Sequence, residues 1–90
     1  MKKYGFYYGA LFSVPKKSWA ILPPLSEAIK IDENCIRVTP LKISSSFVEH
    51  NISLTYKDLK NGPWYFMIKD IIWYDDMDTL LQDNFDKLLE

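Results

Sequence analysis

The residues that follow Asp76 constrain the fold most, because their apolar side chains recur at helical spacing. At about 100° per residue, one arc of such a helix holds Met77, Leu80, Leu81, Phe85, Leu88 and Leu89. The opposite side holds Asp76, Thr79, Asp83, Asp86 and Glu90. Either Asp75 or Asp76 can cap the first turn. Asn84 falls inside the apolar arc. Either its amide has a hydrogen-bond partner, or the helix packs less deeply there than the pattern indicates.

The N-terminal segment alternates with the period of two that indicates a β-strand. Between residues 4 and 14, one face carries Tyr4, Phe6, Tyr8, Ala10, Phe12 and Val14. The other face carries Gly5, Tyr7, Gly9, Leu11 and Ser13. Two glycines on one face predict a bend or the close approach of another segment. Residues 15–18 are predicted to turn and residues 19–22 to return as a short strand that ends at Pro23-Pro24.

The middle of the chain has weaker patterns. Residues 24–29 are predicted to form one or two helical turns, since proline is tolerated at the first helical position. Residues 35–38 and 41–43 indicate a strand that is interrupted at Pro40. The three serines at 44–46 predict a loop.

Two further strands are predicted in the second half. Ile52, Leu54 and Tyr56 alternate with polar residues, and residues 64–74 are apolar on both faces, as in a central strand covered on both sides. The Asn61-Gly62 pair predicts a turn that joins them into a hairpin. With the C-terminal helix, these segments predict an α+β fold: an antiparallel sheet of four to five strands with an amphipathic helix packed on one face.

The size and composition of the chain favour one small intracellular domain over residues 1–90. Ninety residues can bury only about two-thirds of their unfolded surface. Three Trp, six Tyr and five Phe are more aromatic residues than a core of this size needs, so some are expected at the surface. Cys35 is the single cysteine, which excludes an internal disulfide and favours a cytoplasmic location. Residues 1–14 resemble a signal peptide only superficially, and no apolar run is long enough to span a membrane.

No residue pattern predicts catalysis, a metal or a cofactor. Asp75, Asp76 and Asp78 are interpreted as the start of a helix, because no EF-hand glycine or glutamate follows them. His50 has no nucleophile beside it, and Cys35 has no second cysteine or motif around it. The chain is therefore predicted not to be an enzyme and to have no small-molecule substrate.

Charge is distributed unevenly, although the net charge is only −1. Residues 1–45 carry seven Lys or Arg against three acids, and residues 46–90 carry four against nine. This polarity favours a protein or nucleoprotein partner with a basic groove. The residues predicted to contact it are Asp75, Asp76, Asp83, Asp86, Glu90 and Tyr74. The alternative is a nucleic-acid-binding sheet that uses Lys2, Lys3, Lys16, Lys17 and Trp19. Without a partner, the acidic residues are an ordinary solvated helix face, the N-terminal aromatic residues belong to the core, and the lysines solvate an edge strand.

In general character, though not in any motif, the chain is similar to phage anti-defence proteins, including anti-CRISPR proteins, and to toxin-immunity proteins. These are small, charge-polarised proteins without a catalytic site. The similarity implies a stoichiometric inhibitor that acts in the cytoplasm, or in the host cytoplasm if a phage encodes it. No membrane partner is expected, and nucleic acid is the less favoured partner.

Overall fold

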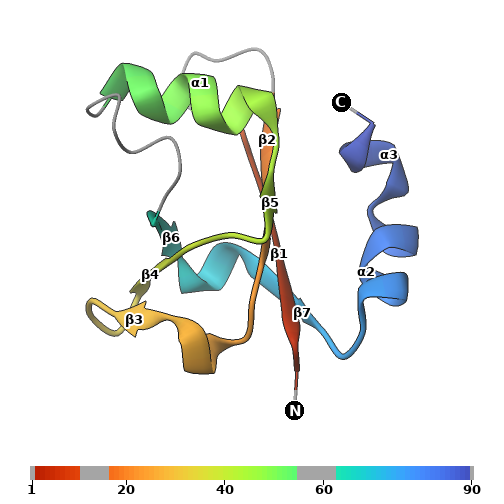
Figure 1. The fold of residues 1–90 in the computed structure, drawn as a ribbon, viewed down its shortest axis with the longest axis horizontal. Coiled ribbons are helices and arrows are strands. Elements are labelled where there is room, and N and C mark those ends of the chain that lie inside the picture. The colour runs from red at the N-terminus through yellow and green to blue at the C-terminus, as the bar shows by residue number, and fades with distance from the viewer. Residues whose placement is uncertain (1, 11–16, 55–62, 90) are drawn as a thin grey trace.

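The larger of two antiparallel sheets stands at the centre of the computed structural model, which describes residues 2–10, 17–54 and 63–89 (Figure 1). In the order β5-β2-β1-β7, it contains β1 (Tyr4–Ala10), β2 (Lys17–Leu22), β5 (Lys42–Ile43) and β7 (Ile71–Tyr74). The smaller sheet, in the order β3-β4-β6, contains β3 (Ile29–Lys30), β4 (Cys35–Val38) and β6 (Trp64–Met67). The predicted α+β class is confirmed.

Helices lie on both sides of the larger sheet. Figure 1 shows α1 (Ser45–Leu54) on the same side as the smaller sheet, and α2 (Met77–Asp83) and α3 (Phe85–Leu88) on the opposite side. Two short 3₁₀ turns, η1 (Leu25–Glu27) and η3 (Ile68–Asp70), connect strands. None of the helices in the described ranges is long and apolar enough to cross a membrane.

The alternation of β1 distributes its side chains between two cores. Phe6 lies opposite Ile21 of β2 and Ile72 of β7, and its ring belongs to the core beneath α2 and α3. Tyr7 points to the other side and packs against the core beneath α1. The predicted strand is confirmed over residues 4–10, and residues 11–14 lie outside the described part of the chain.

Aromatic rings dominate the first core, which lies between the two sheets and α1. Its buried members are Ala20, Leu22, Ile36, Val38, Phe47, Trp64, Phe66 and Ile71. The Phe47 ring lies 5.4 Å from Phe66 and 5.5 Å from Trp64, between centroids. Among the described residues, the buried apolar side chains of the second core are those of Phe6, Ile21 and Leu80. Tyr4, Tyr8, Trp19, Tyr74, Met77 and Leu88 surround them.

The predictions of a loop over residues 44–46 and of a strand from Ile52 to Tyr56 are wrong over residues 45–54, which form α1. Residues 55–56 lie outside the described part of the chain. The side chain of Ser44 explains where this helix begins. Its Oγ accepts a hydrogen bond from the backbone N–H of Phe47 at 3.2 Å, which is the contact that a helix N-cap makes. Ser44 is buried where β5 meets β2, and its N–H donates to the carbonyl of Trp19. The hairpin predicted over residues 52–74 is therefore wrong at its first strand, and its predicted turn at residues 61–62 lies outside the described residues.

The long central strand predicted over residues 64–74 is also wrong. β6 and β7 occupy that range, η3 separates them, and each lies at the edge of a different sheet. The second face of β6, which the sequence pattern placed in a core, is exposed at Tyr65 and Met67. The segments 35–38 and 41–43 are likewise strands of different sheets. One predicted sheet thus becomes two.

The C-terminal helix is confirmed, with a break at Asn84 that separates α2 from α3. Asp76 is the N-cap: its Oδ1 accepts from the backbone N–H of Thr79 at 2.8 Å, and its Oδ2 accepts from the Thr79 hydroxyl at 3.2 Å. These bonds hold the pKa of Asp76 below its usual value, the backbone bond having the larger effect. Of the two predicted caps, Asp75 and Asp76, the structure has Asp76 in that role.

Candidate functional site

Only half of the apolar arc on the C-terminal helices faces the sheet. Leu80 and Asn84 are buried, whereas Leu81, Phe85 and Leu89 are 38%, 63% and 72% exposed. These three residues recur at intervals of four along α2, α3 and the residue that follows, and we call them the apolar stripe. A depression of about 400 Å³ lies along it, lined by Leu81, Gln82 and Phe85. Exposed apolar side chains at helical spacing are the usual means by which a helix docks into a groove.

Asn84 fixes which side of the helices turns outward. Its side-chain amide donates to the carbonyl of Leu80 at 2.8 Å and to the hydroxyl of Tyr74 at 3.2 Å. A buried amide is costly unless it is paired. The bond to Leu80 lies within the helix, whereas the bond to Tyr74 of β7 forms only when Asn84 faces the sheet. With Leu80 and Asn84 toward the sheet, Leu81 and Phe85 are rotated to the side of the helices.

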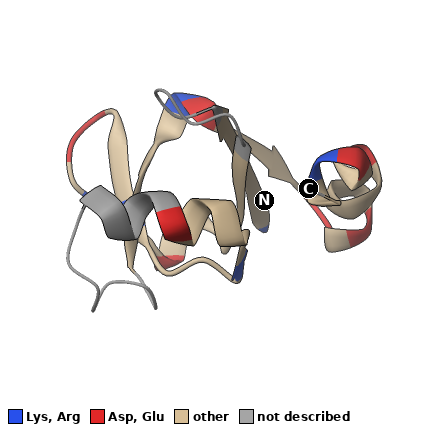
Figure 2. Cartoon of the chain, turned by 90° about the horizontal axis from the view of Figure 1, so that it is seen from above, with Lys and Arg blue, Asp and Glu red and all other residues tan. Residues whose placement is uncertain are grey.

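The predicted acidic residues lie on the same two helices and on the segment before them. Figure 2 shows Asp positions along α2 and α3, with one Lys position near the C-terminal end. Asp83 and Asp86 are exposed and form no ion pair within the described ranges. That Lys is Lys87, and its Nζ lies 5.4 Å from the centre of the Tyr8 ring. The acidic side of the helices is therefore largely uncompensated.

The other predicted partner-binding residues that the structure describes have structural contacts. Asp75 lies 3.7 Å from the ammonium of Lys2, measured from its Oδ2. Asp76 caps α2, and Tyr74 is half-buried, with its hydroxyl accepting from Asn84. Glu90 lies outside the described residues. Of the predicted set, Asp83 and Asp86 are the described side chains with no structural task, so they are available to a partner.

The residues of the nucleic-acid alternative are not brought together in the described part of the chain. Trp19 packs in the second core, and its indole nitrogen is buried. Lys2 pairs with Asp75, and Lys3 is exposed, with its backbone N–H donating to Tyr74. Lys16 and the side chain of Lys17 lie outside what the structure describes. Since α2 and α3 cover the face that carries Tyr4, Tyr8 and Trp19, these rings form a core.

The described residues hold no group of three or more His, Cys, Asp or Glu side chains placed to bind a metal ion. Cys35 is half-buried, and its Sγ lies 3.8 Å from the carbonyl oxygen of Ile36. The side chain of His50 is not among those described.

The helical pattern indicated one apolar arc against the sheet and left only the depth of packing at Asn84 open, so it did not identify the apolar stripe. The position of Asn84 was the signal that could have found it. An amide in the centre of an apolar arc must point to a hydrogen-bond acceptor, and the residues on one side of it must then turn away. Comparisons of this chain with models of protein families, with curated proteins and with solved structures find no match.

Proposed function

We propose that this chain is a stoichiometric protein-binding inhibitor that contacts its target through α2 and α3. The observation that carries the proposal is the exposure of the apolar stripe beside the unpaired carboxylates of Asp83 and Asp86. The whole proposal rests on these features of the C-terminal helices and on the charge polarity of the chain.

The two kinds of side chain have different tasks in such a contact. Burial of an exposed Phe or Leu removes apolar surface from water, at about 25 cal/mol per Å², so the stripe supplies affinity. Exposed carboxylates contribute little to affinity, but they speed the encounter with a positive surface and orient it. Phe85 is the central residue of the stripe, the position at which aromatic side chains most often dominate binding energy.

The charge of the helices defines the complementary surface. A second copy of this face would bring Asp83 and Asp86 toward their own counterparts, which disfavours self-association through it. The complement is an apolar groove with Lys or Arg along one border, on a protein or nucleoprotein. A groove that is filled by α2 and α3 cannot hold its own ligand, and this occlusion is the proposed mode of inhibition.

Affinity capture from host lysate, with and without nuclease, tests the proposal. The tagged chain should recover one dominant protein at near-equal stoichiometry despite nuclease, as measured by mass spectrometry. Phe85→Ala with Leu89→Ala should lower the affinity for that protein by at least about tenfold, since two central apolar anchors are removed. Ile29→Ala with Ile31→Ala is the matched control, because this exposed apolar pair lies in and beside β3.

Charge reversal separates the acidic side chains from the stripe. Asp83→Lys with Asp86→Lys should slow association with the captured protein and should remove most of its dependence on salt, while leaving dissociation nearly unchanged. Asp76 is left intact because it caps α2. Equal affinity for the stripe variant and the control variant would show that the helices are not the contact surface, and recovery of only nuclease-sensitive material would exclude the protein-binding class.

A further inference from the structure

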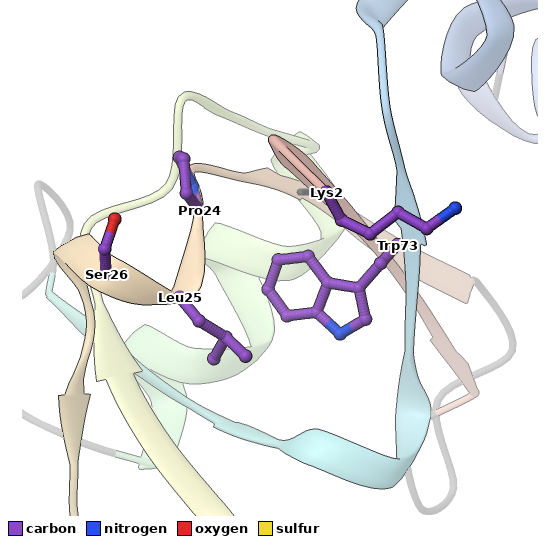
Figure 3. Close-up of a pocket in the computed structure, with 5 residues that line it drawn as sticks. All are labelled: Lys2, Pro24, Leu25, Ser26 and Trp73. Atoms are coloured by element: carbon purple, nitrogen blue, oxygen red, sulfur yellow. The ribbon is translucent and has the colours of Figure 1, made fainter.

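A second hollow lies on the side of the larger sheet away from α2 and α3, where Trp73 packs against the first core. Its volume is about 490 Å³, and it is lined by Lys2, Pro24, Leu25, Ser26 and Trp73 (Figure 3). Sites for small molecules usually have roughly 300–1,000 Å³ and mainly apolar walls. The hollow has both properties, and it shares no residue with the apolar stripe.

One wall is the indole of Trp73, and Gly5 allows it to lie where it does. The two residues are opposite each other across β1 and β7. A Cβ on Gly5 would lie 2.9 Å from Cζ3 of the Trp73 ring and 2.8 Å from the Ile71 side chain, closer than such atoms approach. The glycine therefore lets the ring extend across the strand toward Leu25, as Figure 3 shows.

The opposite wall is η1, and its backbone is fixed by two hydrogen bonds. The N–H of Glu27 donates to Pro24 at 2.9 Å, and the N–H of Ala28 donates to Leu25 at 3.0 Å. Pro24 has no N–H and a restricted φ, which further limits the freedom of this turn. Leu25 stays 48% exposed at the edge of the hollow, so a ring placed between Leu25 and Trp73 would bury apolar surface on both sides.

Among the described residues that line the hollow, only Lys2 is charged, so it decides the charge of the ligand. Its stem lies beside Trp73 in Figure 3, and its ammonium is 3.7 Å from Asp75. Both side chains are more than half exposed, at 58% and 67%. Figure 3 shows the ammonium directed away from Leu25, so the Lys2 side chain must turn to meet a ligand in the hollow. An exposed pair of this kind contributes little, so the ammonium can leave Asp75 for another carboxylate. A cationic ligand would be drawn to the indole face, but Lys2 would repel it.

We infer that this hollow binds a small planar aromatic molecule that carries one carboxylate. The ring lies between Leu25 and the Trp73 indole, and the carboxylate pairs with the Lys2 ammonium. No bond is made or broken, and no protein partner is required. The site is separate from the surface of the proposed function, so either assignment can fail without the other.

Titration of the ¹⁵N-labelled protein with 2-naphthoate, monitored by NMR, tests this site. Saturable shifts are expected at the amides of Leu25, Ser26 and Trp73 and at the Trp73 indole. The uncharged 2-naphthamide should shift the same signals with about two- to fivefold weaker affinity, which is the contribution of one exposed ion pair. Shifts that do not saturate, or that spare these residues, would overturn the assignment.

Lys2→Met gives the second measurement, because methionine keeps an unbranched apolar stem and removes the charge. It should weaken 2-naphthoate to the affinity of 2-naphthamide and leave the affinity of 2-naphthamide unchanged. Lys3→Met is the matched control, since Lys3 is an exposed lysine next to Lys2 that does not line the hollow. If Lys2→Met and Lys3→Met weaken 2-naphthoate equally, general charge attraction is responsible and the anion site is refuted.

Discussion

Asn84 is the residue on which the exposed surface of the C-terminal helices depends. It ends α2, begins α3 and is 2% exposed. Its backbone N–H also donates to the Leu80 carbonyl, at 3.2 Å, so backbone and side chain close the same turn. Because the amide reaches Tyr74 of β7 as well, it couples the helices to the edge of the larger sheet. The orientation of the apolar stripe follows from these contacts.

Replacement of this amide tests its contribution. Asn84→Ala should lower the free energy of unfolding by about 1–3 kcal/mol, because it removes two side-chain hydrogen bonds from a buried position. Tyr74→Phe removes only the bond to Tyr74 and should cost about 0.5–1.5 kcal/mol. Urea unfolding measures both values. If Asn84→Ala costs no more than Tyr74→Phe, the bond to Leu80 does not hold the break in place.

The start of α2 shows how one side chain defines an element. Asp76 accepts two hydrogen bonds from Thr79 in the folded chain, and these bonds lower its pKa. In the unfolded chain the group has an ordinary pKa of about 3.9. The folded state therefore binds the proton less readily than the unfolded state. The resulting stabilisation is complete above the unfolded pKa and is lost as the pH falls through the folded pKa.

Comparison with Asp76→Asn isolates the effect of this charge, since asparagine keeps an oxygen that can cap the helix. The natural chain should be more stable than Asp76→Asn at pH 6, and the difference should shrink steadily below about pH 4. Urea midpoints between pH 2.5 and pH 7 measure it. Asp76→Ala lacks the cap at every pH and should be the least stable of the three near neutrality. A difference that does not change with pH would contradict the proposed role of the carboxylate.

Local patterns predicted β1 and the C-terminal helices correctly. The alternation of residues 4–10 and the helical period from Met77 onward were sufficient, because each follows from backbone geometry. The start of α1 was missed, although Ser44 followed by apolar residues is a possible N-cap. The alternation of Ile52, Leu54 and Tyr56 was given more weight than that cap. A short apolar alternation does not distinguish a strand from part of a helix.

The sequence alone could not show that residues 64–74 form two strands, β6 and β7, because tertiary contacts separate them. The N–H of Ile68 donates to the carbonyl of Asn34 beside the smaller sheet, and Ile71 then pairs with Tyr7 in the larger one. Nothing local indicates that the chain changes sheets at η3. The candidate surface was predicted only in part for the same reason: Asp83 and Asp86 followed from the period, whereas the stripe depends on how Asn84 packs.

At the scale of the whole molecule, the larger sheet belongs to both cores. Neighbouring residues of β1 and β2 point to opposite sides: Phe6 and Ile21 enter the second core, and Tyr7 and Ala20 contribute to the first. One strand backbone carries the side chains that enter both cores. If the side chains on one face lose their packing, those on the other face are therefore also displaced. A chain of 90 residues has a stability of about 5–13 kcal/mol, which leaves little for two independent units. We therefore expect the two cores to unfold together.

The tryptophans allow this expectation to be measured, because Trp64 lies in the first core and Trp19 in the second. In a variant with Trp19→Phe and Trp73→Phe, the tryptophan fluorescence comes from Trp64 and follows the first core. In a variant with Trp64→Phe and Trp73→Phe, it comes from Trp19 and follows the second core. Leu80→Ala should remove about 2–5 kcal/mol from the second core. When Leu80→Ala is introduced into each of these two variants, the free energy of unfolding obtained from urea titration should fall by the same amount in both. This is expected although Leu80 does not belong to the core of Trp64. A shift confined to Trp19 would mean that α2 and α3 unfold from a first core that remains folded without them.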